Sequence, residues 1–279
     1  MARLFVVATP LGNLEDITLR ALRVLKEVDL IACEDTRHTG QLLEAHGIQT
    51  PTTSYFEHNE RAKAPVILEA LRAGKDVALV SDAGTPGVSD PGYRLIREAR
   101  DAGLEVIPVP GPSAAIAALS VSGLPTDRFL FEGFLPARAA ARRRRLAELA
   151  AVVETIVLYE TPVRVLDALE DLRAAFGDRE AFLCREATKR HEEYRRGTLA
   201  SLHASLAERD RVRGEIVLVV AGAEPAPAAS SDDVESLFAR FVEEGRSRRE
   251  AVKEIARLTG LPARDVYKRV LPDAATEED

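Results

Sequence analysis

The segment 81–92, Ser-Asp-Ala-Gly-Thr-Pro-Gly-Val-Ser-Asp-Pro-Gly, has the composition of a ligand-binding loop. It follows directly on an apolar run, and ligands of parallel sheets bind at the carboxyl ends of the strands. Its glycines permit positive φ and close approach of the backbone to a ligand, while its prolines stiffen it. Asp82 offers an acceptor for a ligand hydroxyl or amine. The alternative is a long connector with helix-capping residues, although long ordered loops usually serve a function.

Two common phosphate-binding signatures are absent around this loop. No lysine follows its glycines, so it is not a nucleoside-triphosphate loop, and no Gly-x-Gly-x-x-Gly follows the first apolar run. A second small-residue stretch, 110–114 (Pro-Gly-Pro-Ser-Ala), also follows an apolar run. It would let a flat ligand approach the start of a helix, with Ser113 as the expected cap. A purely structural helix start is an equally good interpretation.

Three further stretches concentrate charge. The acids of 33–37 (Cys-Glu-Asp-Thr-Arg) predict either a polar active-site rim or a helix start with favourable acids. Segment 184–197 carries both signs, which suits an acid or base beside phosphate-binding cations, or else a solvated hairpin. Arg138 and Arg142 to Arg145 form a basic block that could clasp a phosphate backbone, or be a solvated loop. Spacing around His191 does not suit a metal, and none is predicted.

Alternating apolar runs and helical patterns must position these stretches. In the first half, strands joined through helices predict a mainly parallel sheet. In the second half some strands follow one another without a helix, so that sheet is predicted to be mixed. The fold class is therefore α/β, with an N-terminal domain over 1–112 and a second domain over 113–222.

The C-terminal part differs from the rest of the chain in composition and predicted secondary structure. Residues 223–231 have the composition of a linker, and about three helices are expected over 232–279. Ala256, Gly260, Leu261 and Val266 have the spacing of a helix-turn-helix, although a plain helical hairpin gives the same pattern. Lysine and arginine exceed acids locally between Arg246 and Arg269, and the acidic tail 277–279 masks that excess in the total.

The composition of the chain narrows the class of protein. The chain has 279 residues, 46% of them apolar, and a net charge of −7. That charge argues weakly against a general nucleic-acid binder, but local patches override the average. Its apolar runs are all shorter than the roughly 20 residues of a membrane span. Cys33 and Cys184 have no nearby partner for a disulfide or zinc cluster. These features predict a cytoplasmic protein without membrane or metal.

Taken together, these stretches resemble the tetrapyrrole-methylase-like methyltransferases, in particular the branch that modifies small-subunit ribosomal RNA. Seven motifs in order carry the resemblance, and it spans essentially the whole chain: 7–14, 33–37, 81–92, 110–114, 131–136, 159–162 and 184–189. Tetrapyrrole-modifying relatives have a Gly-rich loop after the first strand. Here that place holds Thr-Pro-Leu-Gly-Asn, residues 9–13, which favours the RNA branch.

The resemblance implies S-adenosylmethionine (SAM) as methyl donor, bound in a cleft between the two α/β domains. It implies methylation of a cytidine ribose 2′-hydroxyl in the decoding region of 16S rRNA, on naked RNA or the small ribosomal subunit, and a homodimer. Carried over by position, the residues implied to contact the cofactor are Pro10, Asp82, Ala83, Gly84, Val88, Ser113, Ala114, Leu158, Tyr159, Glu215 and Ile216.

Transfer from a sulfonium needs alignment of oxygen, methyl and sulfur, and help for a hydroxyl that must lose its proton. Lys189, its pKa lowered by neighbouring Arg185 and Arg190, is one hypothetical base. Glu34, Asp35 and Glu186 compete with it, while Arg37 and Arg185 would hold flanking phosphates. The RNA is expected to be gripped by basic residues of the arginine block and of the tail: Arg138, Arg142, Arg143, Arg144, Arg145, Arg248, Arg249 and Lys268.

Two other interpretations stay open at this point. One is a methyltransferase for a tetrapyrrole or another small acceptor, against which the basic patches count. The other is a non-catalytic, SAM-sensing regulator that binds nucleic acid through its tail.

Overall fold

The structure, a computed structural model, describes residues 2–224 and 231–270. The chain separates into two compact units, Met1–Ala223 and Glu224–Asp279. The first unit contains two five-stranded sheets, and the second is helical where it is described. Among the described residues, no helix is both long and apolar enough to cross a membrane.

The first sheet is wholly parallel, as the alternation of strands and helices predicts. Its order is β3-β2-β4-β1-β5. Its strands are β1 (Arg3–Val7), β2 (Leu30–Cys33), β3 (Thr52–Ser54), β4 (Val77–Val80) and β5 (Glu105–Val109). All four residues of β4 are buried because helices cover both faces of the sheet.

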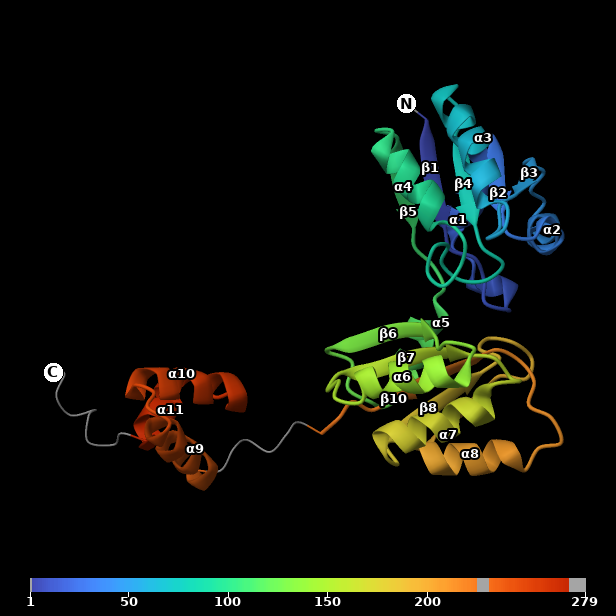
Figure 1. Ribbon diagram of the computed structural model, residues 1–279. Helices are drawn as coiled ribbons and strands as arrows, with labels where there is room; N and C mark the ends of the chain where they lie inside the picture. Colours follow the sequence, from blue (N-terminus) through green and yellow to red (C-terminus); the bar gives the residue numbers. More distant parts are fainter. Residues whose placement is uncertain (1, 225–230, 271–279) are drawn as a thin grey trace. The chain divides into compact units, whose positions relative to one another are not determined.

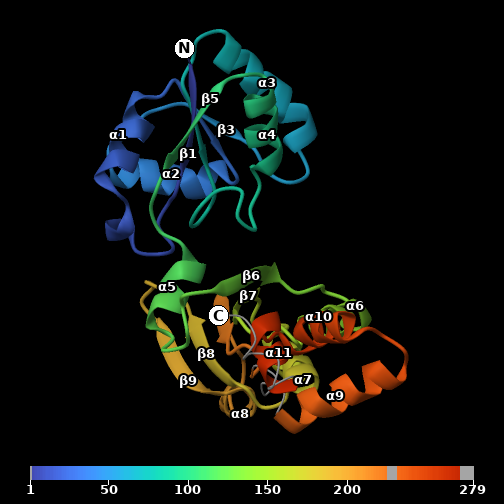
Figure 2. The same ribbon diagram turned by 90° about the vertical axis from the view of Figure 1, so that its left-hand side faces the viewer.

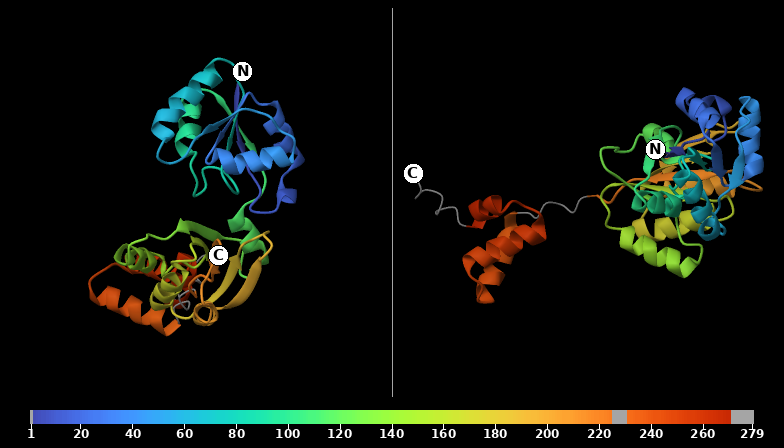
Figure 3. Two further views of the ribbon diagram at one scale, coloured as in Figure 1. Left: turned by 90° about the vertical axis from the view of Figure 1, so that its right-hand side faces the viewer. Right: turned by 90° about the horizontal axis from the view of Figure 1, so that it is seen from above.

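Two pairs of helices make those covering layers. On one face, α1 (Leu19–Glu27) and α2 (Thr36–Ala45) pack on the sheet, and on the other lie α3 (Glu60–Arg72) and α4 (Tyr93–Asp101). Figure 2 shows the two pairs on opposite sides of the strands, and the left view of Figure 3 shows the same layers from the other side. The polar loops therefore gather at the sheet edge where the strands end.

The second sheet is mixed, as predicted, with the order β6-β7-β10-β8-β9 and one parallel pair, β6 with β7. Its strands are β6 (Phe129–Phe134), β7 (Thr155–Glu160), β8 (Glu180–Arg185), β9 (Glu193–Thr198) and β10 (Ile216–Val220). One face packs on α5 (Ala114–Val121). The other packs on α6 (Ala139–Leu149), α7 (Val165–Phe176) and α8 (Leu199–Ala207), which Figure 1 shows grouped beside the strands.

Two charged segments form helices. Residues 33–37 contain the end of β2 and the start of α2, as the helix-start interpretation predicts, with Asp35 as the N-cap accepting from the Arg37 backbone amide at 2.8 Å. Arg142 to Arg145 lie in α6 and not in a loop, and Arg138 is the N-cap residue of that helix. Ser113 stands at the N-cap position of α5, as predicted, although its side chain makes no capping hydrogen bond.

The described part of the C-terminal unit contains α9 (Ser231–Glu243), α10 (Arg248–Thr259) and α11 (Ala263–Val270). Gly260 ends α10 in the left-handed conformation, at φ 68°. Val266 is buried, and Ala256 and Leu261 pack against the same small core, as a helix-turn-helix spacing requires. Most of the expected linker, 225–230, and the acidic tail 277–279 lie outside the described residues.

Candidate functional site

A cavity of about 390 Å³ lies among the loop after β4, the start of α5 and the ends of the second sheet's strands. We call it the aromatic cavity, because Phe134 and Tyr159 line it. Most of the residues expected to bind the cofactor are in its wall: Asp82, Ala83, Gly84, Val88, Ser113, Ala114, Tyr159, Glu215 and Ile216. The loop 81–92 thus contributes to a wall that residues far away in the sequence complete.

Backbone contacts hold the 81–92 loop against its neighbours. Thr9 and Gly84 exchange two backbone hydrogen bonds, of 2.9 and 3.1 Å, so the loops after β1 and β4 are joined. Gly84 has φ 80°, a conformation that disfavours a side chain. The Thr85 hydroxyl donates to the Pro112 carbonyl at 3.3 Å, which ties the loop to the start of α5. The wall is therefore preorganised by its own backbone.

Two aromatic rings, those of Phe134 and Tyr159, line the aromatic cavity, and Phe131 packs behind Tyr159. Tyr159 packs edge-on against Phe131 at 5.0 Å and against Phe134 at 5.6 Å between ring centroids. Its hydroxyl accepts a hydrogen bond from the Ala115 backbone amide at 3.2 Å. Phe134 remains half exposed. A flat apolar group would find a rigid surface here.

Five carboxylates make this cavity acidic: those of Glu34, Asp82, Asp90, Glu160 and Glu215. Burial, together with repulsion from Glu34, Asp82 and Glu215, raises the pKa of Asp90 to about 6. Burial and the nearby Asp82 also raise the pKa of Glu34. Repulsion between carboxylates that are partly buried costs free energy, so the cavity favours a cationic ligand.

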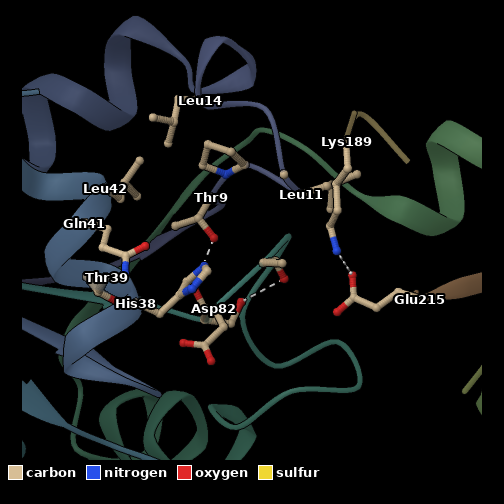
Figure 4. Close-up of a pocket in the computed structure, with 14 residues that line it drawn as sticks. Thr9, Leu11, Leu14, His38, Thr39, Gln41, Leu42, Asp82, Lys189 and Glu215 are labelled. Carbon is tan, nitrogen blue, oxygen red and sulfur yellow. Dashed lines mark hydrogen bonds and ion pairs between the residues drawn. The ribbon is translucent and has the colours of Figure 1, made fainter. Parts of the chain in front are cut away.

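A second cavity, of about 520 Å³, adjoins the first. We call it the α2 cavity, because His38, Thr39, Gln41 and Leu42 line it from that helix. Figure 4 shows these side chains on the opposite side from the ion pair of Lys189 with Glu215. The two cavities have four wall residues in common: Leu11, Asp82, Ala83 and Glu215.

Lys189 is held as an ammonium ion. Its Nζ lies 3.0 Å from Glu186 Oε1 and 2.9 Å from Glu215 Oε2. Burial acts to lower the pKa of Lys189, but these two hydrogen-bonded carboxylates outweigh it and raise the pKa. The expectation that arginine neighbours lower the pKa of Lys189 is therefore wrong, because the side chains bonded to it are acids.

The loop that carries Lys189 is tied to the first half of the unit. The Asn13 backbone amide donates to the Thr188 hydroxyl at 3.2 Å. The Lys189 side chain lies so close over Gly12 that a Cβ there would overlap it. Glu186 and Thr188 have positive φ, 53° and 64°, which is uncommon for residues other than glycine. This local strain of the backbone persists only because surrounding contacts fix it.

The other predicted catalytic residues have structural partners. Arg185 donates from Nε to Glu193 at 2.8 Å and from its two terminal nitrogens to the carbonyls of Arg213 and His191, so all three guanidinium nitrogens already have partners. Asp35 forms a two-bond ion pair with exposed Arg37, which lowers the pKa of the Asp35 carboxyl far below its usual range. Glu186 is likewise a poor base, since bonds from Lys189 and the Glu215 amide outweigh burial and lower its pKa.

The arginine block divides into two kinds of residue. Arg142 is buried and donates to Asp171 at 2.7 Å, so its predicted contact with RNA is wrong. Arg143 pairs with the same carboxylate at 2.9 Å but is exposed, and Arg145 forms a bidentate bond with Glu132. Arg138 and Arg144 are exposed, and within the described residues neither has an ion pair. The basic side chains Arg248 and Arg249 on α10, and Lys268 on α11, are also exposed.

Two expected cofactor residues do not line the aromatic cavity. The Leu158 side chain is buried in the core between the second sheet and its helices, so the predicted contact of this residue would have to come from its backbone. Pro10 lines the α2 cavity instead of the aromatic one. Sequence reasoning also missed Asp90 and Phe134, although both stand in motifs that it singled out. Within residues 2–224 and 231–270, no group of His, Cys, Asp or Glu is arranged to hold a metal ion.

The chain is similar to known methyltransferases. The model of the family Tetrapyrrole (Corrin/Porphyrin) Methylases matches residues 3–203 of this chain. The Ribosomal RNA small subunit methyltransferase I of Synechocystis sp. is 46% identical over 271 residues, which cover 96% of this chain and 97% of the relative. That of Pseudomonas aeruginosa is 51% identical over 236 residues, 84% of each chain. Uroporphyrin-III C-methyl transferase from Thermus thermophilus, complexed with S-adenyl homocysteine, has a TM-score of 0.56, 22% identity and coverage of 78% of this chain and 97% of its own.

Proposed function

Because the chain belongs to the tetrapyrrole methylase family, and within it to the small-subunit ribosomal RNA methyltransferases I, we propose that it methylates 16S rRNA with SAM. The acceptor is the ribose 2′-hydroxyl of a cytidine in the decoding region. The observation that carries this proposal is the 46% identity with a relative of that name over 97% of the relative's length.

The aromatic cavity fits SAM chemically. SAM combines a flat adenine, a ribose diol, and two cationic groups, the sulfonium and the ammonium of its methionine part. Phe134 and Tyr159 offer ring surface for adenine, and the acidic wall offers both acceptors for hydroxyls and charge for the cations. The glycine backbone around Gly84 leaves room for close approach.

When bound, SAM supplies an electrophilic methyl group next to a good leaving group. The protein's contribution is then mainly alignment, because the acceptor oxygen must approach in line. The four residues common to both cavities, Leu11, Asp82, Ala83 and Glu215, mark where donor and acceptor would meet. Asp82 is fixed there, since its Oδ1 accepts from the Asp35 amide at 3.1 Å.

Lys189 is positioned to stabilise negative charge on the acceptor oxygen. It lines the α2 cavity and is held as an ammonium ion. A hydroxyl that is losing its proton gains most from a fixed cation in a partly dry site. Among the carboxylates that the sequence suggests, Glu34 is the best candidate for the general base, because it lines the aromatic cavity and its pKa is raised.

Affinity for SAM should depend on pH through Asp90. Its pKa is raised to about 6, so the carboxylate that attracts the cationic ligand is present above pH 6 and is lost as the pH falls through it. We expect the Kd for SAM to rise about 5- to 10-fold between pH 7.5 and pH 5 by isothermal titration calorimetry. S-adenosylhomocysteine, which lacks the sulfonium charge, should respond less, and Asp90→Asn should flatten the profile. An unchanged wild-type Kd over that range would contradict the assignment.

Contacts with RNA are inferred for the exposed basic residues Arg138, Arg144, Arg248, Arg249 and Lys268. Such side chains neutralise backbone phosphates without reading sequence. We also infer a homodimer, which the exposed apolar side chains of Ile116 and Val121 on α5 support. A cytoplasmic location follows from the proposed substrate.

The direct test supplies labelled SAM with small ribosomal subunits that lack the modification. We expect label in 16S rRNA, at one 2′-O-methylcytidine that blocks alkaline cleavage next to it. Naked 16S rRNA assayed in parallel identifies the form of the substrate. Label on neither RNA, with SAM binding intact, would reject the proposed acceptor.

A further inference from the structure

The α2 cavity contains polar side chains that the proposed chemistry leaves without a role. His38 and Gln41 are exposed on α2, and both line this cavity. Across residues 2–224 and 231–270, neither side chain has a hydrogen-bond partner. Apolar groups of Pro10, Leu14 and Leu42 complete the wall. An imidazole and a carboxamide above apolar walls suit a ligand that is flat and has a polar edge.

The position of this cavity limits what that ligand is. It adjoins the aromatic cavity through Leu11, Asp82, Ala83 and Glu215. If SAM occupies the aromatic cavity, an in-line transfer brings the acceptor to that common wall from the other side. The occupant of the α2 cavity is then the part of the RNA that bears the reacting hydroxyl.

Size and charge favour one nucleoside over a length of phosphate backbone. The volume of about 520 Å³ is in the range of pockets that enclose small organic ligands. Among the described residues, Lys189 is the one lysine or arginine in its wall, and it is already paired with Glu186 and Glu215. A groove for several phosphates would need more free cations.

We propose that the α2 cavity receives the target nucleoside, extruded from the RNA, and that Gln41 and His38 bind its base. This inference rests on the proposed function. A carboxamide presents one acceptor and two donors, which can pair with the amine and carbonyl on the edge of a cytosine. Enzymes that act on one nucleotide commonly take it out of its stack and read it in this way.

Single substitutions test the site. We expect Gln41→Ala and His38→Ala to lower kcat/KM for small ribosomal subunits about 10- to 100-fold, mostly through KM. The Kd for SAM and the thermal midpoint should not change, because both side chains lack partners in the fold. Matched controls are Gln49→Ala and His58→Ala, which remove the same exposed side chains outside both cavities. Wild-type kcat/KM in both cavity variants would overturn the proposal.

A double-mutant cycle, which combines Gln41→Ala with a substitution of the target nucleotide, decides whether Gln41 contacts the base. Subunits carrying uridine in place of the target cytidine should be poorer substrates for the wild-type enzyme. For Gln41→Ala, the difference between cytidine and uridine should shrink to less than about threefold. An undiminished difference would mean that Gln41 contacts another part of the RNA, and would reject base recognition. Failure of the wild-type enzyme on unaltered subunits would instead reject the proposed function itself.

Discussion

Lys189→Ala is expected to reduce kcat for methyl transfer about 10²- to 10³-fold, the usual effect of losing one group that stabilises a developing oxyanion. The ammonium lies 3.0 Å from Glu186 and 2.9 Å from Glu215, so its charge and place are both fixed. Single-turnover rates at saturating SAM measure the chemical step. The Kd for SAM should change little, because Lys189 lines the α2 cavity and not the aromatic one.

The control for this prediction is Arg190→Ala, which removes an adjacent exposed cation that lines neither of these cavities. It should leave kcat near the wild-type value. The pH profile adds a second criterion. Since the pKa of Lys189 is raised, the rate should show no increase between pH 7 and 9 that depends on this residue. If the wild-type rate rose between pH 7 and 9 and this rise were absent in Lys189→Ala, the result would support Lys189 as the general base.

Arg142→Ala is expected to have the largest effect on stability, about 3–5 kcal/mol of unfolding free energy. Arg142 is buried on α6 and donates to Asp171 at 2.7 Å. Its removal leaves a half-satisfied carboxylate in the packed interface between α6 and α7, with only exposed Arg143 to pair with it. Urea denaturation followed by circular dichroism measures the change.

Arg144→Ala provides the matched comparison. It deletes an exposed arginine of the same helix and should alter stability by less than about 0.5 kcal/mol. Replacing both partners, as Arg142→Met with Asp171→Leu, should recover much of the loss, because no buried charge remains unpaired. A stable Arg142→Ala protein that bound RNA weakly would reverse the assignment made from the structure.

Segments at strand ends were the most predictable part of this molecule. The loop 81–92 is identifiable because glycine and proline constrain the backbone wherever they occur, and its place after β4 follows from an apolar run. The parallel and mixed sheets follow from the order of runs and helices. These features depend on local sequence, so they could be inferred without coordinates.

Features that depend on distant partners could not be inferred. Arg142, Leu146 and Leu149 are the buried positions of α6, a helical spacing, but an arginine at the first of them conceals the pattern. Its partner Asp171 is far along the chain. In the same way, Lys189 was expected to be surrounded by its arginine neighbours in sequence, whereas Glu215 lies beside it in space.

The left-handed residues before Lys189 have a consequence for how this protein could evolve. Glu186 and Thr188 adopt their conformations in the second half of the unit. In the first half, the Asn13 amide donates to the Thr188 hydroxyl and Gly12 leaves room for the Lys189 side chain. The two halves are therefore not interchangeable modules. A chimera that joined the second half to the first half of a relative lacking glycine at position 12 would keep both sheets and displace the ammonium. Selection would then favour recombinants in which the loop of Gly12 and Asn13 and the loop of Lys189 come from the same parent.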